Sequence, residues 1–350
     1  MQKPALPGKK LPLARARGSG VSEESLVRME PLRAESPLPL VIRPAVDGVD
    51  LVEWVGSHRD ELHQLLLRHG GILFRGFGVR GPEALGSFTA AVSTGPLEYQ
   101  ERSSPRTHVA NRVYTSTEHP AEQEIFLHNE QSYNLTFPLK IIFACATAAE
   151  EGGATPVADV REVYRLLPEE IRRPFEEKGY TYVRNFGDGF GLPWQEAFQT
   201  DDPAEVEEYC RRNRIEVEWK DGGRLRTRQV RPAVARHPRS GEAAWFNHAT
   251  FFHRTTLDPS VRAVFEAAFQ REEDFPNNTL YGDGTPIDPE VAEALRRVYR
   301  ECTVSFRWEE GDVLLLDNLL TAHAREPFRG PRKILTAMSD PFHWDDVARG

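Results

Sequence analysis

Histidines placed two residues before a carboxylate are the residues of this sequence best suited to metal chemistry. The pattern occurs three times, at residues 58–60, 128–130 and 343–345. Two histidines and one carboxylate on one face of an iron ion form the ligand set of non-haem Fe(II) oxygenases, which leaves positions open for oxygen and a chelating co-substrate. In a strand, residues i and i+2 point to the same side, so one short segment can supply two of these ligands.

One of the three triplets suits such a site better than the others. His58 and Asp60 fall in a predicted helix, where residues i and i+2 diverge by about 200°, so we expect them on the solvated surface. Residues 343–345 lie at the C-terminal end, with no histidine after them. Residues 128–130 (HNE) follow the apolar run IFL, which is compatible with a strand. The alternative for His128 is a buried histidine with a purely structural hydrogen bond.

Four later histidines are candidates for the remaining ligand. His237 lies in HPRSG, a composition typical of a surface turn. His248 and His253 lie in WFNHATFFH, where they could line a substrate pocket or be buried and hydrogen-bonded. His323 follows the strand-like run DVLLLDN and precedes Arg332 by nine residues. A buried arginine is a strong bidentate partner for a carboxylate, such as the second carboxylate of 2-oxoglutarate.

The surrounding pattern predicts a mainly β fold with helices around it. Residues 1–39 are rich in Pro, Gly and Lys/Arg, so we expect a flexible N-terminal segment, followed by one domain over residues 40–345. Runs of strands with scattered helices are typical of an antiparallel sandwich or jelly roll. The predicted strands are GGILFRGF, KIIFACAT, GYTYVRNF, IEVEWK, RLRTRQV, AAWFN, TVSFRW, DVLLLDN and KILTAMS. The predicted helices cover about 58–69, 82–92, 168–178, 203–213, 258–271 and 288–300.

Bulk composition narrows the class of protein. The chain has 350 residues and 39% hydrophobic residues, which is typical of a globular protein. A net charge of −9 argues against a nucleic-acid partner, although local basic patches stay possible. The longest apolar run, Ile141–Ala149, is too short to span a membrane. Three widely spaced cysteines form neither a disulfide framework nor a CxxC pair, so we expect a cytoplasmic protein.

Three motifs in order, FLHNE, GGATPVAD and GDVLLLDNLLTAHAREPFRGPRKI, resemble the TauD/TfdA family of taurine dioxygenase-like enzymes. The Glu of the HNE triplet and the HARxPF context are similar to the clavaminate synthase-like members. The segments YTSTEHPAEQEIFLHNEQSY and YVRNFGDGFGLPWQEAFQT resemble SyrP-like hydroxylases, which are associated with nonribosomal peptide biosynthesis. The resemblance covers about Leu40 to Pro341.

This resemblance implies a double-stranded β-helix that uses Fe(II), 2-oxoglutarate and O2. Carried over by position, His128, Glu130 and His323 become the metal ligands. Thr155 and Arg332 match the residues that hold the distal carboxylate of 2-oxoglutarate. The alternative for Thr155 is a hydroxyl that only stabilises the turn after the two glycines. Because the carboxylate ligand is retained, hydroxylation is favoured over halogenation, and desaturation or cyclisation stays open.

The chain departs from the family pattern at one position. Taurine dioxygenase and clavaminate synthase have a second arginine, four residues after the first, which binds an acidic group of the substrate; here that residue is Thr336. We therefore expect an amino acid held as a thioester on a peptidyl carrier protein. Alternatives are hydroxylation of a free amino acid or a small carboxylic or sulfonic acid, a non-catalytic jelly-roll binding protein, and a cupin-type isomerase or hydrolase.

A basic strand is a candidate binding surface for the carrier protein. The run RLRTRQVR places Arg224, Arg226 and Arg228 on one face of a predicted strand. One interpretation is a docking surface for an acidic carrier protein. The other is a solvated edge strand of the sheet.

Overall fold

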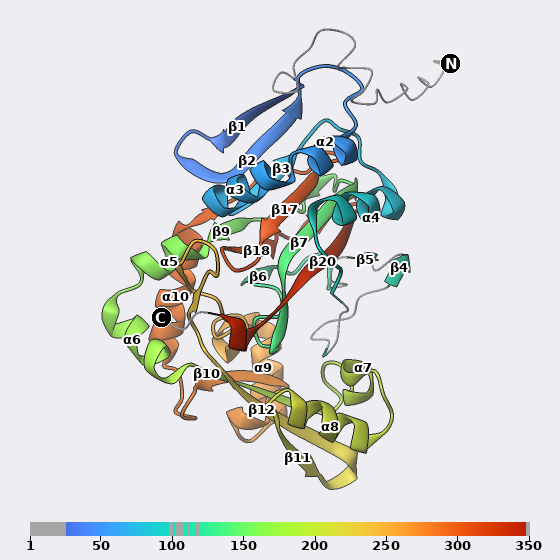
Figure 1. Ribbon diagram of the computed structural model, residues 1–350. Coiled ribbons are helices and arrows are strands. Elements are labelled where there is room, and N and C mark those ends of the chain that lie inside the picture. Colours follow the sequence, from blue (N-terminus) through green and yellow to red (C-terminus); the bar gives the residue numbers. More distant parts are fainter. Residues whose placement is uncertain (1–25, 98–100, 102–107, 111–112, 116–118, 348–350) are drawn as a thin grey trace.

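The structure is a computed structural model, which describes residues 26–97, 101, 108–110, 113–115 and 119–347. Its largest layer is an eight-stranded sheet with the order β1-β2-β3-β17-β7-β20-β5-β4 (Figure 1). These strands are β1 (Val27–Arg33), β2 (Ser36–Pro44), β3 (Gly71–Phe74), β17 (Val313–Asp317), β7 (Thr136–Thr147), β20 (Lys333–His343), β5 (Val113–Thr115) and β4 (His108–Ala110). Strands far apart in the sequence, such as β3, β17 and β7, are direct neighbours.

A smaller sheet faces this layer. Its order is β16-β9-β18-β6, formed by β16 (Thr303–Val304), β9 (Val157–Asp159), β18 (Thr321–Arg325) and β6 (Ile125–His128). Val157 and Val304 of the smaller sheet pack in one buried cluster with Phe143, Leu314 and Ile334 of the larger sheet. Two sheets that enclose a common core form a jelly roll, and this confirms the predicted mainly β fold with surrounding helices.

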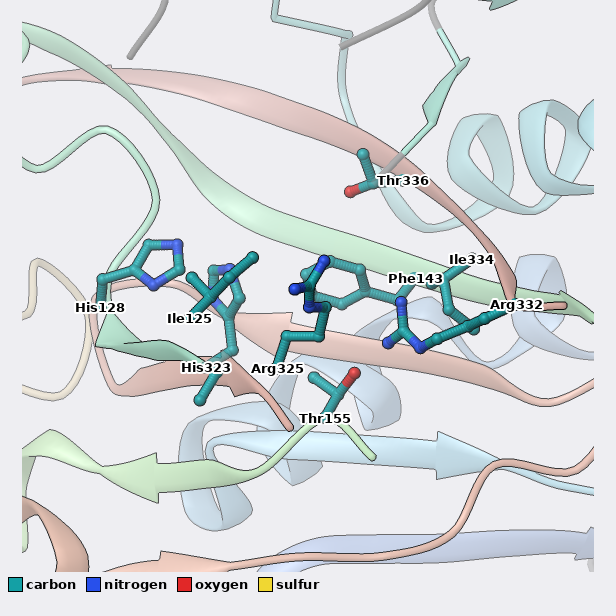
Figure 2. A pocket seen from close by; sticks show the side chains of 10 residues that line it. Ile125, His128, Phe143, Thr155, His323, Arg325, Arg332, Ile334 and Thr336 are labelled. Atoms are coloured by element: carbon teal, nitrogen blue, oxygen red, sulfur yellow. The ribbon is translucent and has the colours of Figure 1, made fainter. Parts of the chain in front are cut away.

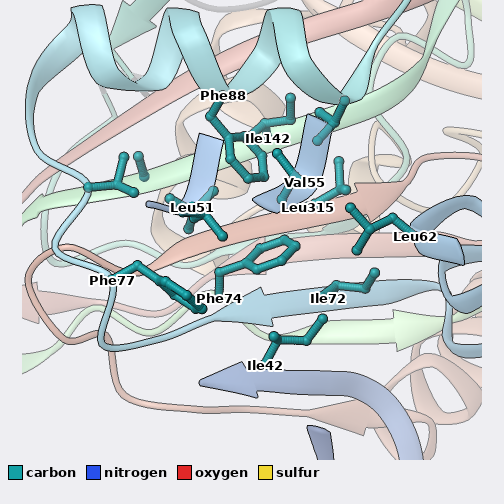
Figure 3. Close-up of a cluster of buried hydrophobic side chains, with 14 of the residues drawn as sticks. Ile42, Leu51, Val55, Leu62, Ile72, Phe74, Phe77, Phe88, Ile142 and Leu315 are labelled. Carbon is teal, nitrogen blue, oxygen red and sulfur yellow. The ribbon is translucent and has the colours of Figure 1, made fainter. Parts of the chain in front are cut away.

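Helices cover the outer faces of both sheets. On the larger sheet lie α2 (Leu51–Ser57), α3 (Arg59–His69) and α4 (Gly81–Val92). Their apolar side chains, including Leu51, Leu62 and Phe88, pack against Phe74 and Ile142 of the strands, as Figure 3 shows. On the smaller sheet lie α5 (Val160–Leu166), α6 (Glu169–Lys178) and α10 (Pro289–Glu301), whose buried residues form one cluster with those of β6, β9 and β18.

A third sheet forms the far end of the molecule (Figure 1). Its order is β11-β12-β10-β15, from β11 (Glu216–Lys220), β12 (Arg224–Arg231), β10 (Tyr180–Phe186) and β15 (Asn277–Tyr281). The accompanying helices are α7 (Trp194–Phe198), α8 (Pro203–Arg212) and α9 (Pro259–Ala268). Short pairs join β13 (Ala235–Arg236) to β14 (Ala243–Ala244) and β8 (Glu151–Gly152) to β19 (Phe328–Arg329). Single 3-10 turns are η2 (Asp221–Gly223), η3 (Arg254–Thr256), η4 (Glu272–Asp274) and η5 (Trp344–Asp346).

The predicted start of ordered structure near Leu40 is too late. Strands β1 and β2 pair as an antiparallel hairpin from Val27 to Pro44, although both contain prolines. β1 is the edge strand of the sheet, and proline is tolerated there because an outward N–H would make no ladder bond. The rest of the predicted flexible segment, residues 1–25, lies outside the described residues, as do residues 116–118 of the YTSTEHP motif.

Two predicted strands are shorter than expected. Only Thr303–Val304 of TVSFRW and Ala243–Ala244 of AAWFN form ladders. The aromatic residues that follow, Phe306, Trp308, Trp245 and Phe246, are buried by packing without strand pairing. None of the described helices is long and apolar enough to cross a membrane.

Candidate metal centre

The structure brings His128, Glu130 and His323 together between the two facing sheets. Each offers one ligand atom, and these atoms lie within 4.8 Å of one another. His128 ends β6, and His323 is its register partner on the neighbouring strand β18. Within the described part of the chain, this is the one group of three histidine, cysteine or acidic residues with such spacing. Two imidazoles and a carboxylate are a donor set suited to Fe(II).

Strand alternation turns His323 toward the larger sheet. Its neighbours Ala322 and Ala324 are buried in the cluster beneath α5 and α10, and successive strand residues point to opposite faces. The imidazole of His323 therefore faces the core, where its ring centroid lies 5.0 Å from that of Phe143 on β7. The histidine that we expected to follow the strand DVLLLDN lies instead on a short strand of its own.

The His128 ring is oriented by its own strand. Nδ1 of His128 lies 2.9 Å from the carbonyl oxygen of Phe126. A carbonyl can only accept a hydrogen bond, so Nδ1 carries the proton and Nε2 keeps its lone pair. This tautomer is the one that can bind a metal through Nε2, and a backbone acceptor on the other nitrogen is a common support for metal-binding histidine.

Glu130 lies just after β6 and not on the strand with His128, contrary to the expected i, i+2 geometry. The turn that carries it is held by Asn318, which is fully buried. The Asn318 side chain accepts a 2.7 Å bond from the Glu130 N–H and donates a 2.9 Å bond to the Glu130 carbonyl. The neighbouring Asn129 donates a further bond of 2.7 Å to the Asn318 carbonyl. The carboxylate position therefore depends on a buried amide that the sequence analysis did not identify.

The alternative triplets lie elsewhere. Asp60 is exposed in the first turn of α3, which begins just after His58. Asp345 pairs on the surface with Arg214 at 2.6 Å, beside His343. The exposure of Asp60 agrees with the surface position expected for the first of these triplets.

The other candidate histidines are buried and hydrogen-bonded within the chain. His237 contacts Asp317 at 3.1 Å, and His253 contacts the Ile287 carbonyl at 3.2 Å. Nδ1 of His248 lies 2.6 Å from the Ser132 hydroxyl oxygen. Burial, with the nearby His128, lowers the pKa of His248 well below its usual value, so its ring is neutral. The centroids of the His248 and His128 rings are 5.6 Å apart, so the His248 ring packs beside that of His128.

Thr155 and Arg332 line the same cavity as His128 and His323, as Figure 2 shows. The Arg332 Nε–H donates a 2.9 Å bond to the Gly153 carbonyl. Burial, together with the neighbouring Arg325, lowers the pKa of Arg332 to about 10, which still leaves the guanidinium charged at neutral pH. One end of the cavity thus presents histidines, and the other presents a cation and a hydroxyl.

The Thr155 hydroxyl has a partner that fixes its polarity. The Trp308 indole N–H donates to it at 3.0 Å, and both side chains are buried. Because the indole can only donate, the Thr155 oxygen is the acceptor in this bond, and its own proton is available for another acceptor. Within the described residues, the Thr155 hydroxyl bonds to Trp308 and not to the glycine turn, which does not support the turn-stabilising role considered for it.

Sequence reasoning also missed one residue that lines the cavity and one that supports a cavity residue. Arg325 lines the cavity from β18, and Trp308 supports Thr155 from the segment before β17. Thr336, the residue in place of the family's second arginine, also lines the cavity. Its side chain is fully buried, and its hydroxyl has no hydrogen-bond partner among the described residues. Arg325 follows His323 by two residues on one strand, which is a signal that the sequence did contain.

The basic strand is not a free docking surface. β12 lies between β11 and β10, so the expected edge strand is wrong. Arg226 is buried and pairs with Asp274, Arg228 pairs with Glu218 at 3.1 Å, and Arg224 pairs with Asp188 at 2.9 Å. These acids neutralise the positive face locally, which removes the basis for a carrier-docking role.

Comparisons with known proteins agree with this geometry. The model of the family "Taurine catabolism dioxygenase TauD, TfdA family" matches residues 34–338. The dapdiamide synthesis protein DdaC of Enterobacter agglomerans is 38% identical over 315 residues, covering 90% of this chain and 95% of DdaC. A clavaminate synthase-like protein of Arabidopsis thaliana is 29% identical over 321 residues, covering 86% of this chain and 93% of that protein.

Solved structures share the fold. PvcB of Pseudomonas aeruginosa has a TM-score of 0.56 at 18% identity, with 94% of this chain and 95% of PvcB covered. A second PvcB structure is described as an Fe, alpha-ketoglutarate dependent oxygenase from an isonitrile synthetic pathway. A taurine dioxygenase from Burkholderia xenovorans has a TM-score of 0.52 at 18% identity, with 93% and 97% of the two chains covered.

Proposed function

Because the chain belongs to the taurine catabolism dioxygenase TauD, TfdA family, we propose that it is an Fe(II)- and 2-oxoglutarate-dependent hydroxylase. His128, Glu130 and His323 hold the iron, and Thr155 and Arg332 bind the distal carboxylate of 2-oxoglutarate. The observation that carries this proposal is the shared cavity. The two histidines line one end, within 4.8 Å of the Glu130 carboxylate, and a guanidinium with a polarised hydroxyl lines the other.

In this reaction the residues of the chain bind and orient the metal and the co-substrate. Iron, 2-oxoglutarate and O2 together supply the oxidising power that hydroxylates a C–H bond, with release of CO2 and succinate. His128, Glu130 and His323 would hold the metal, and a site with three protein ligands would leave Fe(II) able to bind the co-substrate and O2. Arg332 pairs with the distal carboxylate, and Thr155 donates its free proton to the same group. Phe143 and Ile334 make the cavity wall between these ends apolar and exclude water.

The test is stoichiometric succinate formation. Purified protein with Fe(II), 2-oxoglutarate, O2 and a candidate amino acid, free or as a thioester, should form succinate and hydroxylated product in equal amounts, and a metal chelator should stop this. A non-catalytic jelly-roll binding protein would bind these molecules without releasing succinate. A cupin-type isomerase or hydrolase would turn over its substrate without consuming 2-oxoglutarate. Either of those results would reject the hydroxylase.

The substrate we propose is an amino acid carried as a thioester on a peptidyl carrier protein. Two observations support it. The relatives include a dapdiamide synthesis protein and, by fold, an oxygenase of an isonitrile pathway. The family's second arginine is replaced by Thr336, a neutral residue whose buried hydroxyl suits a neutral polar group. A free amino acid or small acid is the second candidate, and the presence of Arg325 in the cavity favours it. The cytoplasmic location stays a prediction.

A further inference from the structure

A second guanidinium faces the cavity between the histidines and Arg332. Arg325 lies on β18, two residues after His323, and only 5% of its surface is exposed. Figure 2 shows its side chain between His323 and Arg332, close to Thr155 in the view, and all four residues line the one cavity. The family position that usually supplies a second arginine is occupied by Thr336, so this cation comes from a different strand.

The hydrogen bonds of Arg325 leave one donor unused. Its two terminal nitrogens donate to the backbone carbonyls of His119 at 2.8 Å, Pro120 at 2.5 Å and Gln123 at 2.8 Å. Its Nε is buried and has no hydrogen-bond partner among the described residues. A buried N–H without an acceptor is costly, and the carbonyl contacts hold the guanidinium so that this donor cannot turn away.

The charge of the cavity points to an anion. Among the described residues, the hydrogen bonds of Arg325 and Arg332 all go to backbone carbonyls and none goes to a carboxylate, although Glu122 is near enough to interact electrostatically with Arg325. The Arg325 side chain is buried, and that of Arg332 is partly buried. Two neighbouring guanidinium groups with no carboxylate hydrogen-bonded to either repel one another. A carboxylate placed between the two guanidinium groups would offset their repulsion. It would also accept the hydrogen bond that the Arg325 Nε–H lacks.

We propose that Arg325 is a second binding residue for the distal carboxylate of 2-oxoglutarate. Its Nε–H donates to this carboxylate alongside Arg332 and Thr155. The proposal rests on the proposed function and assigns to this chain a two-arginine site for the co-substrate. A 2-oxo acid that lacks the distal carboxylate has nothing to offer Arg325, so the residue selects the dicarboxylate.

The experiment compares two 2-oxo acids on the Mn(II)-loaded full-length protein by calorimetry. 2-Oxopentanoate has the same chain length and chelating end as 2-oxoglutarate but ends in a methyl group. Arg325→Gln should weaken binding of 2-oxoglutarate roughly 10-fold or more, as expected for loss of a charge-assisted hydrogen bond. Its effect on 2-oxopentanoate should stay within about 3-fold. Arg325→Lys keeps the charge and should retain part of the preference for the dicarboxylate.

The controls separate this role from simpler ones. Lys333→Gln removes a neighbouring exposed charge and should leave both affinities unchanged. Mn(II) affinity is measured for each variant, since Arg325 also holds the segment before β6. Equal losses of affinity for both 2-oxo acids would show that Arg325 only positions other residues, which would overturn the proposal. An unchanged affinity for both acids would overturn it as well. A wild-type protein that binds no 2-oxoglutarate would overturn the proposed function itself.

Discussion

At the metal end of the cavity, buried backbone groups and one side-chain amide orient the candidate ligands. The Phe126 carbonyl selects the tautomer of His128, and Asn318 holds the turn that carries Glu130. At the other end, Trp308 polarises Thr155, and Gly153 holds Arg332. Each of these contacts removes conformational freedom from a group before any ligand arrives, which lowers the cost of binding.

The Arg332 pair gives a sharp test at this scale. Arg332→Ala should raise the KM for 2-oxoglutarate roughly 30-fold or more, because truncating one partner of a buried charge pair costs about 2–5 kcal/mol. The matched control is Lys333→Ala, which removes the adjacent exposed cation. Steady-state kinetics with varied 2-oxoglutarate measures both. A larger effect at Lys333 than at Arg332 would show that the wrong side of the strand has been assigned to the cavity.

The chemistry-bearing residues were predictable to different degrees. His128, Glu130 and His323 could be selected because triplet spacing, a strand-like context and family motifs coincide, and the structure brings them together. Asn318 and Trp308 could not, because their roles depend on contacts with residues 188 and 153 positions away. Such contacts leave no spacing pattern in the sequence. The docking surface considered at Arg224, Arg226 and Arg228 was not supported for a related reason. The acids that pair with these arginines come from other elements, so the sequence pattern of the strand did not reveal them.

At the scale of elements, the loop before β9 positions Thr155 and the Gly153 carbonyl. Gly152 has a φ of +65°, and a Cβ at this position would collide with the Pro327 carbonyl across the β8–β19 pair. Gly152→Ala should therefore destabilise the protein by about 1–3 kcal/mol and raise the KM for 2-oxoglutarate. Gly284→Ala is the control, because Gly284 is also left-handed but has open space around it. Equal effects of the two substitutions would contradict this role of the loop.

An ion pair joins two neighbouring strands of the larger sheet. Arg75 follows β3 and donates to Asp312, just before β17, at 3.0 Å and 2.6 Å, and the Asp312 side chain is 1% exposed. Arg75→Met leaves this carboxylate buried without its partner, so the free energy of unfolding should fall by about 3–5 kcal/mol. Denaturant titration measures it. Arg80→Met breaks an exposed 3.9 Å pair with Glu310 and should change stability by less than about 1 kcal/mol; a similar loss there would contradict the argument.

The elements themselves were largely predictable where their pattern was local. The helices at 59–69, 81–92 and 289–301 have apolar faces at helical spacing, and they form within one or two residues of the expected bounds. β1 and β2 were missed because the prolines of this segment suggested a loop. Their pairing depends on β3, more than 25 residues later, which β2 joins in parallel.

At the scale of the whole molecule, the family shows an oxygenase, and the class of substrate depends on which chemical group the cavity residue Thr336 accepts. If Thr336 faces a neutral thioester, carrier-bound aminoacyl substrates should be hydroxylated far better than free amino acids. An ionised group that enters a pocket without a counter-charge is penalised by desolvation. Mass spectrometry would compare the free amino acid, its pantetheine thioester and the full aminoacyl carrier.

The outcome separates the two substrate classes. Equal efficiency for the free amino acid would reject the tethered substrate and would leave the oxygenase assignment intact. In that case Arg325 is the cavity cation available to the substrate carboxylate, and the calorimetric comparison of 2-oxo acids should also fail. The result of the substrate comparison therefore predicts the result of the calorimetric comparison.

The central claim is that His128, Glu130 and His323 hold the iron. Calorimetric titration of Fe(II) into the anaerobic protein tests it most directly, with wild type compared to His128→Ala and His323→Ala. Each substitution leaves two protein ligands, so we predict loss of measurable Fe(II) binding. Asp60→Ala, in the exposed triplet on α3, should bind Fe(II) as the wild type does. If both histidine variants kept wild-type affinity, or if Asp60→Ala lost it while remaining folded, the metal site would lie elsewhere.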